Sequence, residues 1–200
     1  MNAIAATTTP KRRRSRKVPE ALIYEIVDGR PVYYKGYRDV LNGKLKLEEI
    51  MPDSSLQSWL KAQLTILLGN LLAGKSELMT GELGLFTDNK SRRGADIAFY
   101  KIGQVVLDAH YSRIPPELII EIDIQAEMEG EDEMDYIAGK IEDYHRFGVK
   151  KVIWIFTSIQ KVTVAAAGKP WVTYAWNENI ETIEGATFNL EQLLKGRKIS

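Results

Sequence analysis

The segment that most constrains the fold is ELIIEIDIQ, residues 117–125. Side chains alternate between the two faces of a strand, so one face here is wholly apolar: Leu118, Ile120, Ile122 and Ile124. Glu121 and Asp123 share the other face, roughly 6.5 Å apart along the strand. A strand this apolar is expected at the centre of a sheet, where an unpaired charge is strongly unfavourable. A cation, a metal ion or a solvent-filled cleft must therefore compensate the two acids.

A third acid interrupts another apolar strand, GADIAFY at residues 94–100. Asp96 alternates with Ile97 and Phe99, and it would meet Glu121 and Asp123 if the two strands pair. Three carboxylates with added waters suit an octahedral Mg²⁺ or Mn²⁺. The chain has no cysteine and two histidines, which excludes thiolate sites and a histidine-rich zinc centre. The sequence therefore favours an oxygen-ligated metal.

A lysine follows these acids on a predicted helix that runs from about Asp132 to Phe147 and ends at Gly148. At 100° per residue, the buried stripe of this helix consists of Met134, Ile137, Ile141 and Tyr144. Lys140 lies at the edge of the stripe. Its stem can follow apolar surface while its ammonium group reaches a carboxylate cluster.

The remaining pattern predicts an α/β (α+β) fold in which helices flank a mixed central sheet. A hairpin is expected over residues 21–34 around Asp28-Gly29, and a strand over Lys44–Met51. The main core helix is expected over Leu56–Leu72. Further strands are predicted at 77–87, 94–101, 118–124, 151–156, 160–166 and 171–176, and a short helix at 189–195. Strands 118–124 and 151–156 should be adjacent and parallel, with a right-handed crossover.

The net charge of zero conceals a basic start and an acidic body. Residues 1–17 contain six bases and no acid, and we expect 1–19 to be a disordered basic tail, followed by a single domain over 20–200. No apolar run is long enough to cross a bilayer, and no secretory signal is visible, so we expect a cytoplasmic protein without membrane contact.

Two further surfaces suggest partners. Lys90, Arg92 and Arg93 fall in a predicted loop and could bind nucleic-acid phosphates, as could the basic tail. Three aromatic residues near the C-terminus either fill the core or support a homodimer, and the sequence leaves both open: Trp171, Tyr174 and Trp176.

The order of an Asp strand, a Glu strand and a helix bearing Lys resembles the PD-(D/E)XK nuclease superfamily, and more specifically its Uma-type restriction endonuclease family. The resemblance runs from about Tyr24 to Thr173. It includes YEIVDG, the helix near 55–72, the Asp96 strand, LIIEIDI and, as its most specific part, KIEDYHRFGVKKVIWIF. It implies a restriction endonuclease-like fold and a nuclease domain over 20–200.

By position, the resemblance implies that Asp96 and Glu121 are the two metal-binding acids and that Lys140 is the catalytic lysine. Asp123 stands where the superfamily usually has its lysine, so we take Asp123 as a further metal ligand and Lys140 as the replacement. Ala95 replaces the usual proline. Gln57 and Ser58 occupy the region where relatives often have a histidine.

Three functions stay open at this stage. The first is a Mg²⁺-dependent (or Mn²⁺-dependent) endonuclease, in which a metal-activated water hydrolyses DNA, Lys140 orients that water and the carbonyl of Ile122 is a further ligand. The second is a catalytically degenerate member of the same fold that serves as a binding or interaction module, which the acidic body favours. The third is a structural oxygen-ligand site, for example for Ca²⁺.

Overall fold

The computed structural model describes residues 17–127 and 132–199 of the 200-residue chain. Its main feature is an eight-stranded sheet in the order β2-β1-β4-β5-β6-β7-β8, with β3 paired to β4 outside this path. The strands are β1 (Ile23–Val27), β2 (Arg30–Tyr33), β3 (Ser76–Phe86), β4 (Arg92–Lys101), β5 (Leu118–Ile122), β6 (Lys151–Phe156), β7 (Lys161–Ala166) and β8 (Val172–Ala175). The helices are α1 (Tyr37–Leu41), α2 (Ser55–Leu71), α3 (Glu133–Phe147) and α4 (Leu190–Leu193), and a small second sheet joins β9 (Ile180–Glu181) to β10 (Thr187–Phe188).

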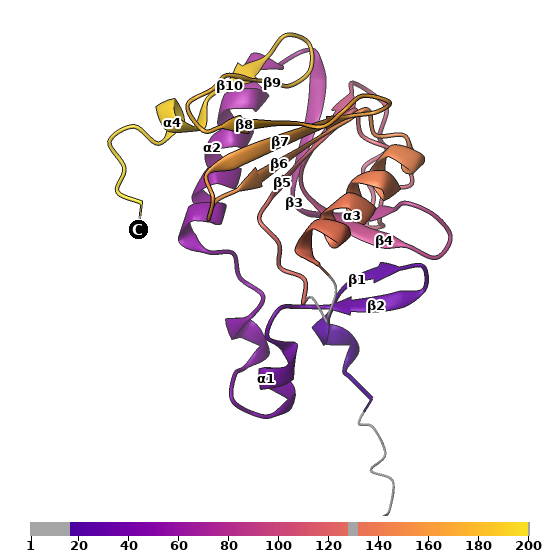
Figure 1. Cartoon of the computed structure of the whole chain (residues 1–200). Helices are drawn as coiled ribbons and strands as arrows, with labels where there is room; N and C mark the ends of the chain where they lie inside the picture. Colours follow the sequence, from indigo (N-terminus) through magenta and orange to yellow (C-terminus); the bar gives the residue numbers. More distant parts are fainter. Residues whose placement is uncertain (1–16, 128–131, 200) are drawn as a thin grey trace, which may run out of the picture.

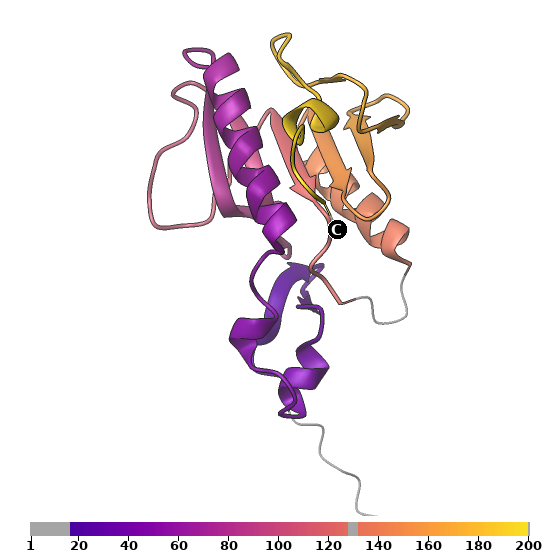
Figure 2. The same cartoon turned by 90° about the vertical axis from the view of Figure 1, so that its left-hand side faces the viewer.

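The two long helices lie on opposite faces of the sheet (Figures 1 and 2). On one face, Leu60, Leu64 and Leu68 of α2 form a core with Ile97 and the apolar residues of β5, β6 and the C-terminal elements. On the other face, α3 packs over β4, β5 and β6 in a second core. Each face of the sheet is therefore buried, which explains why its central strands are so apolar.

Strand β5 lies in the middle of this arrangement, as its composition predicts. It pairs antiparallel with β4, where Ile120 lies opposite Ile97, and parallel with β6, where Glu121 lies opposite Trp154. Helix α3 connects the two parallel strands. The alternation is also confirmed, because Leu118 and Ile120 face α2 whereas Ile119 faces α3. Glu121, two residues after Ile119, therefore points toward α3.

Local sequence signals account for the ends of these elements. Asp28 and Gly29 both have positive φ, 50° and 76°, as a tight two-residue hairpin turn requires. Ser54 caps α2 in a reciprocal box with Gln57. Asp132 accepts a hydrogen bond from the backbone of Met134 at the start of α3. These contacts fix where α2 and α3 begin relative to the sheet.

Three sequence predictions about the fold are wrong. Met134, expected in the buried stripe of α3, is 51% exposed in the first turn of that helix. Lys44–Met51 is not a strand: it contains a 3-10 helix at Leu47–Glu49, and the carboxylate of Glu49 accepts a hydrogen bond from the backbone of Lys46. This local hydrogen bond closes the first turn of the 3-10 helix. The segment therefore pairs with no strand among the described residues, despite its alternating sequence. Strand β5 also ends at Ile122, two residues early.

The predicted basic tail falls almost entirely on residues 1–16, which lie outside the described part of the chain. None of the helices within 17–127 and 132–199 is long and apolar enough to cross a bilayer.

The α2 core gives a direct test of this packing. Leu64→Ala should lower the free energy of unfolding by about 2–5 kcal/mol, because Leu64 is fully buried and its removal leaves a cavity. Ile66 lies on the same helix but is 56% exposed, and Ile66→Ala should cost less than about 1 kcal/mol. Urea denaturation of the two variants measures the difference, and equal losses would contradict the assigned helix face.

Candidate active site

A buried ion pair joins β5 to α3. The Lys140 ammonium group lies 3.2 Å from Glu121 Oε1, and the Tyr144 hydroxyl donates to the same oxygen at 2.6 Å. The side chains of Lys140 and Glu121 are 1% and 4% exposed. The aromatic rings of Tyr24, Tyr144 and Trp154 surround the ammonium at 5.6–5.8 Å. The expected approach of Lys140 to Glu121 is therefore present, but inside the core rather than in an open cleft.

A second carboxylate shares this lysine. Glu25 of β1 lies 2.9 Å from the Lys140 ammonium and 2.8 Å from the Arg93 guanidinium, and it accepts a hydrogen bond from the Tyr136 hydroxyl. Arg93 in turn pairs with Asp143 on α3. Strands β1, β4 and β5 and helix α3 thus meet in one continuous network of buried charges.

Asp96 belongs to a neighbouring cluster around a different lysine. The Lys61 ammonium of α2 lies 2.7 Å from Asp96 Oδ1, 2.7 Å from Asp53 and 3.4 Å from Glu82. The other Asp96 oxygen, Oδ2, accepts the backbone N–H of Ile122 at 2.8 Å. Asp96 is therefore tied to the residue that follows Glu121, so the two acids adjoin, each with its own ammonium group.

The two carboxylates that share Lys140 differ in their pKa values. Burial alone would raise the pKa of Glu25, but Lys140 and Arg93 outweigh it and lower the pKa to about 2. Glu121 lacks an arginine, so burial dominates and raises its pKa to about 8, with Lys140 opposing the shift. The charge of Asp96 adds to the rise in the pKa of Glu121, but burial is the main cause. Burial also raises the pKa of Asp96.

A cavity of about 260 Å³ adjoins this region, although Asp96, Glu121 and Lys140 are not among the residues that line it. Both Glu25 and Glu82 line it, together with Tyr24, Arg92 and Tyr111. Glu82 is placed there by a bulge in β3, where the register with β4 shifts between Thr80 and Leu83.

The backbone at this bulge is unusual. Glu82 has a φ of 61°, in the left-handed region that residues other than glycine rarely adopt. Its side chain is 45% exposed. Burial and the charge of Asp96 raise its pKa. The bulge therefore turns an ionisable group toward the cavity at a cost in backbone strain.

Two predicted site residues lie elsewhere. Asp123 follows the end of β5 with a φ of 57°, and its two oxygens accept hydrogen bonds from the backbone and hydroxyl of Thr157. It does not share the face of Glu121, because the strand ends before it. Arg93 is in β4 rather than a loop, and its side chain is 2% exposed, so it is not available to contact a nucleic acid. Arg92 and Lys90 are exposed, as expected.

Sequence reasoning missed Glu25, Lys61 and Glu82. A signal existed for Glu25, which interrupts an apolar hairpin strand as Asp96 interrupts its own. Lys61 lies one helical turn after Gln57 and one turn before Leu64, so it shares the buried face of α2. Glu82 had no signal, because its position depends on the bulge.

The donor chemistry at Asp96 and Glu121 fits a hard divalent cation. Carboxylate oxygens are the ligands that Mg²⁺ prefers, and one or two carboxylates with waters can hold it. The Ile122 carbonyl lies beside them and accepts a hydrogen bond from the Gln57 amide at 3.2 Å, which leaves one lone pair free. Within residues 17–127 and 132–199, however, no group of three His, Cys, Asp or Glu side chains is arranged around one ion position. Any metal must therefore rely on two carboxylates, one of which already holds the Lys61 ammonium.

The raised pKa of Glu121 predicts a pH-dependent stability. Its carboxyl group is protonated in the folded protein up to about pH 8 but ionises near 4.5 in the unfolded chain, so its contribution is greatest below 4.5 and is lost as pH rises toward 8. Glu121→Gln has no carboxyl group at this position and should not show this loss. Between pH 5 and pH 9, the free energy of unfolding of the wild type should therefore fall by roughly 2–4 kcal/mol more than that of Glu121→Gln. Urea unfolding at both pH values measures the difference.

Glu142→Gln provides the matched control, because Glu142 is exposed on α3 and the substitution removes the same charge. Its unfolding free energy should follow that of the wild type at both pH values. If Glu121→Gln also followed the wild type, the assignment of a raised pKa to Glu121 would be wrong.

Comparisons with known proteins place the chain in a family. The family model Uma2, described as "Putative restriction endonuclease", matches residues 40–197. A crystal structure described as "a putative nuclease belonging to DUF820" from Anabaena variabilis ATCC 29413 matches with a TM-score of 0.61 and 12% identity, covering 84% of this chain and 88% of that chain. No curated protein matches. At 12% identity the structural match shows the fold alone, a mixed α+β sheet flanked by helices. The family model spans most of the chain, and this protein belongs to the Uma2 family.

Proposed function

We propose that this protein is an endonuclease that hydrolyses phosphodiester bonds in DNA. The observation that carries the proposal is the adjacency of Asp96 and Glu121, each beside a buried lysine, next to a cavity lined by Glu25 and Glu82. Ionisable groups with raised pKa values beside a cavity are typical of catalytic sites. The family description and the description of the structural relative support the same reaction class.

In this proposal Asp96 and Glu121 would hold a Mg²⁺ or Mn²⁺ ion. Such an ion, when bound, would polarise the phosphate and lower the pKa of a coordinated water. The Lys61 ammonium, which pairs with Asp96 here, also pairs with Asp53 and Glu82, so it would keep two carboxylate partners beside an ion at Asp96.

Lys140 then acts as a positioning residue rather than by contact with the water. Its ammonium group is buried between Glu25 and Glu121, and the carboxylates raise its pKa although burial opposes them. A permanent charge at this point fixes the orientation of Glu121 and balances its ionised form. This revises the expectation that Lys140 orients the attacking water.

Glu82 is the candidate for proton acceptor. Hydrolysis forms a bond from the water oxygen to phosphorus and breaks the bond from phosphorus to one sugar oxygen; the water gives up a proton and the leaving oxygen gains one. Glu82 lines the cavity, and burial and the charge of Asp96 raise its pKa above the usual glutamate value, which makes its carboxylate a stronger base.

Plasmid nicking tests the proposed reaction. The wild type should convert supercoiled plasmid to open circles in Mg²⁺ or Mn²⁺ and should be inactive in EDTA. Glu121→Gln and Asp96→Asn should each lower the rate at least about a hundredfold, because each removes a carboxylate that the proposal assigns to the metal ion. Glu142→Gln should retain full activity. Wild-type protein that never nicks in either metal would refute the proposal, provided that its unfolding is cooperative.

The pH dependence of nicking tests the role of Glu82. A proton acceptor must be ionised, so the wild-type rate should fall as the pH falls through the pKa of Glu82. With Mg²⁺ at a saturating concentration, so that ionisation of Glu121 does not limit the rate, Glu82→Gln should lower the rate about a hundredfold and remove this acidic limb of the profile. A Glu82→Gln profile with the wild-type shape would exclude Glu82 as the acceptor.

A binding module without catalysis is the second candidate, favoured by the deep burial of Glu121 and by its existing bonds to Lys140 and Tyr144. It predicts DNA binding without nicking in either metal. A cytoplasmic location and homodimer formation through the C-terminal aromatic residues stay predictions; Trp176 is buried in the α2 core, whereas Trp171 is exposed.

A further inference from the structure

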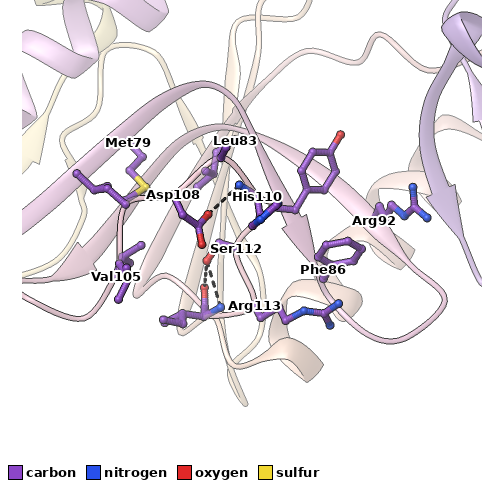
Figure 3. Close-up of a pocket in the computed structure, with 14 residues that line it drawn as sticks. Met79, Leu83, Phe86, Arg92, Val105, Asp108, His110, Ser112 and Arg113 are labelled. Carbon is purple, nitrogen blue, oxygen red and sulfur yellow. Dashed lines mark hydrogen bonds between the residues drawn. The ribbon is translucent and has the colours of Figure 1, made fainter.

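A larger groove lies next to the cavity of the candidate active site. Its volume is about 780 Å³, and its walls come from β3, β4 and the segment 105–114 (Figure 3). Arg92 and Tyr111 line both hollows, so the groove and the cavity are adjacent. None of the residues proposed for hydrolysis lines this groove, which therefore needs an explanation of its own.

The groove combines aromatic rings with arginines. Arg113 lies over the Phe86 ring at 4.3 Å and Arg92 at 5.6 Å, measured from the guanidinium carbon to the ring centroid. The Tyr111 ring contacts that of Phe86, with centroids 5.5 Å apart, and Tyr111 is 53% exposed. Figure 3 shows Phe86 between Arg92 and Arg113. Asp108 is the acid of the lining, and one of its oxygens accepts the backbone N–H of His110.

The aromatic surface is held in place before any ligand binds. Ser112 exchanges backbone hydrogen bonds with Gly84 and Phe86, which fixes the segment to β3. The Tyr111 ring packs against Gly84 so closely that a Cβ there would lie 2.5 Å from it. An aromatic ring fixed by contacts with the backbone loses little conformational freedom when a base stacks on it.

We propose that this groove binds a single-stranded segment of DNA that leads into the candidate active site. Exposed aromatic rings beside arginines are the features by which proteins bind unpaired nucleotides: bases stack on the rings and guanidinium groups contact phosphates. A base within a duplex is already stacked on both faces and cannot reach Tyr111. The inference rests on the proposed function for the identity of the polymer, and it adds that the substrate contains unpaired nucleotides.

Binding in EDTA tests this inference without requiring catalysis. The probe is fluorescein-labelled (dT)20, measured by fluorescence anisotropy at 50 and 200 mM NaCl, with a 20-base-pair duplex as the comparison. The wild type should bind (dT)20 more tightly than the duplex. Tyr111→Leu should weaken binding roughly 5- to 100-fold and Tyr111→Phe should not, because phenylalanine keeps the stacking face. Arg113→Gln should weaken binding and reduce the dependence on salt by about one counterion.

Lys169→Gln is the matched control for Arg113→Gln, since Lys169 is exposed just before β8, an edge strand of the sheet that does not pair with β3 or β4. This variant should bind like the wild type. The inference would be overturned if the wild type bound the duplex more tightly than (dT)20. It would also be overturned if both Arg113→Gln and Tyr111→Leu bound (dT)20 as tightly as the wild type, with Tyr111→Leu shown to unfold cooperatively. Thymidine monophosphate that binds as tightly as (dT)20 would also overturn it, because the groove would then hold a nucleotide rather than a strand.

The two proposals fail separately. Protein that binds (dT)20 through Tyr111 and Arg113 but never nicks plasmid refutes the proposed hydrolysis and leaves the groove assignment intact. Protein that nicks normally when Tyr111 and Arg113 are substituted, with unchanged binding of (dT)20, refutes the groove assignment alone.

Discussion

The buried charge of Lys140 is the constraint on which the rest of the site depends. An ammonium group enclosed by three aromatic rings is tolerated only when carboxylates meet it directly, and Glu25 and Glu121 do so from two strands that are not neighbours in the sheet. Strand β1, strand β5 and helix α3 must therefore keep fixed relative positions. Removing one partner of such a group costs about 3–5 kcal/mol, because the remaining charge stays buried.

A second ammonium group, that of Lys61, makes the site asymmetric. The Lys61 ammonium pairs with Asp96 from helix α2, whereas the Lys140 ammonium pairs with Glu121 from helix α3. Arg93 adds its charge to Glu25 alone, so the pKa of Glu25 falls to about 2 while burial raises the pKa of Glu121 to about 8. One carboxylate is permanently charged and the other can gain or lose a proton near neutral pH, a separation of roles that acid–base chemistry requires.

The route from solvent to these groups passes the bulge in β3. Glu82 lines the cavity there, and Tyr111 and Arg92 line both the cavity and the adjacent groove beside residues 105–114. Rigid strands thus hold the buried charges, whereas the bulge and the connecting segment shape the surface that a substrate would meet. In many enzymes, rigid strands and helices form the scaffold, and loops form the surface that binds the substrate.

Period and alternation are local properties of the chain, so the sequence was enough to predict the central strand, the faces of β4 and β5, both long helices and the hairpin. The approach of Lys140 to Glu121 followed from the family resemblance. The sequence also identified Asp96 as an acid in an apolar strand. Tertiary structure alone decided that Asp123 bonds to Thr157, that Arg93 is buried and that Glu82 enters the cavity. Those outcomes depend on where β5 ends, on which strands lie beside it and on a register shift in β3, and such pairings between distant segments leave no periodic trace in either segment.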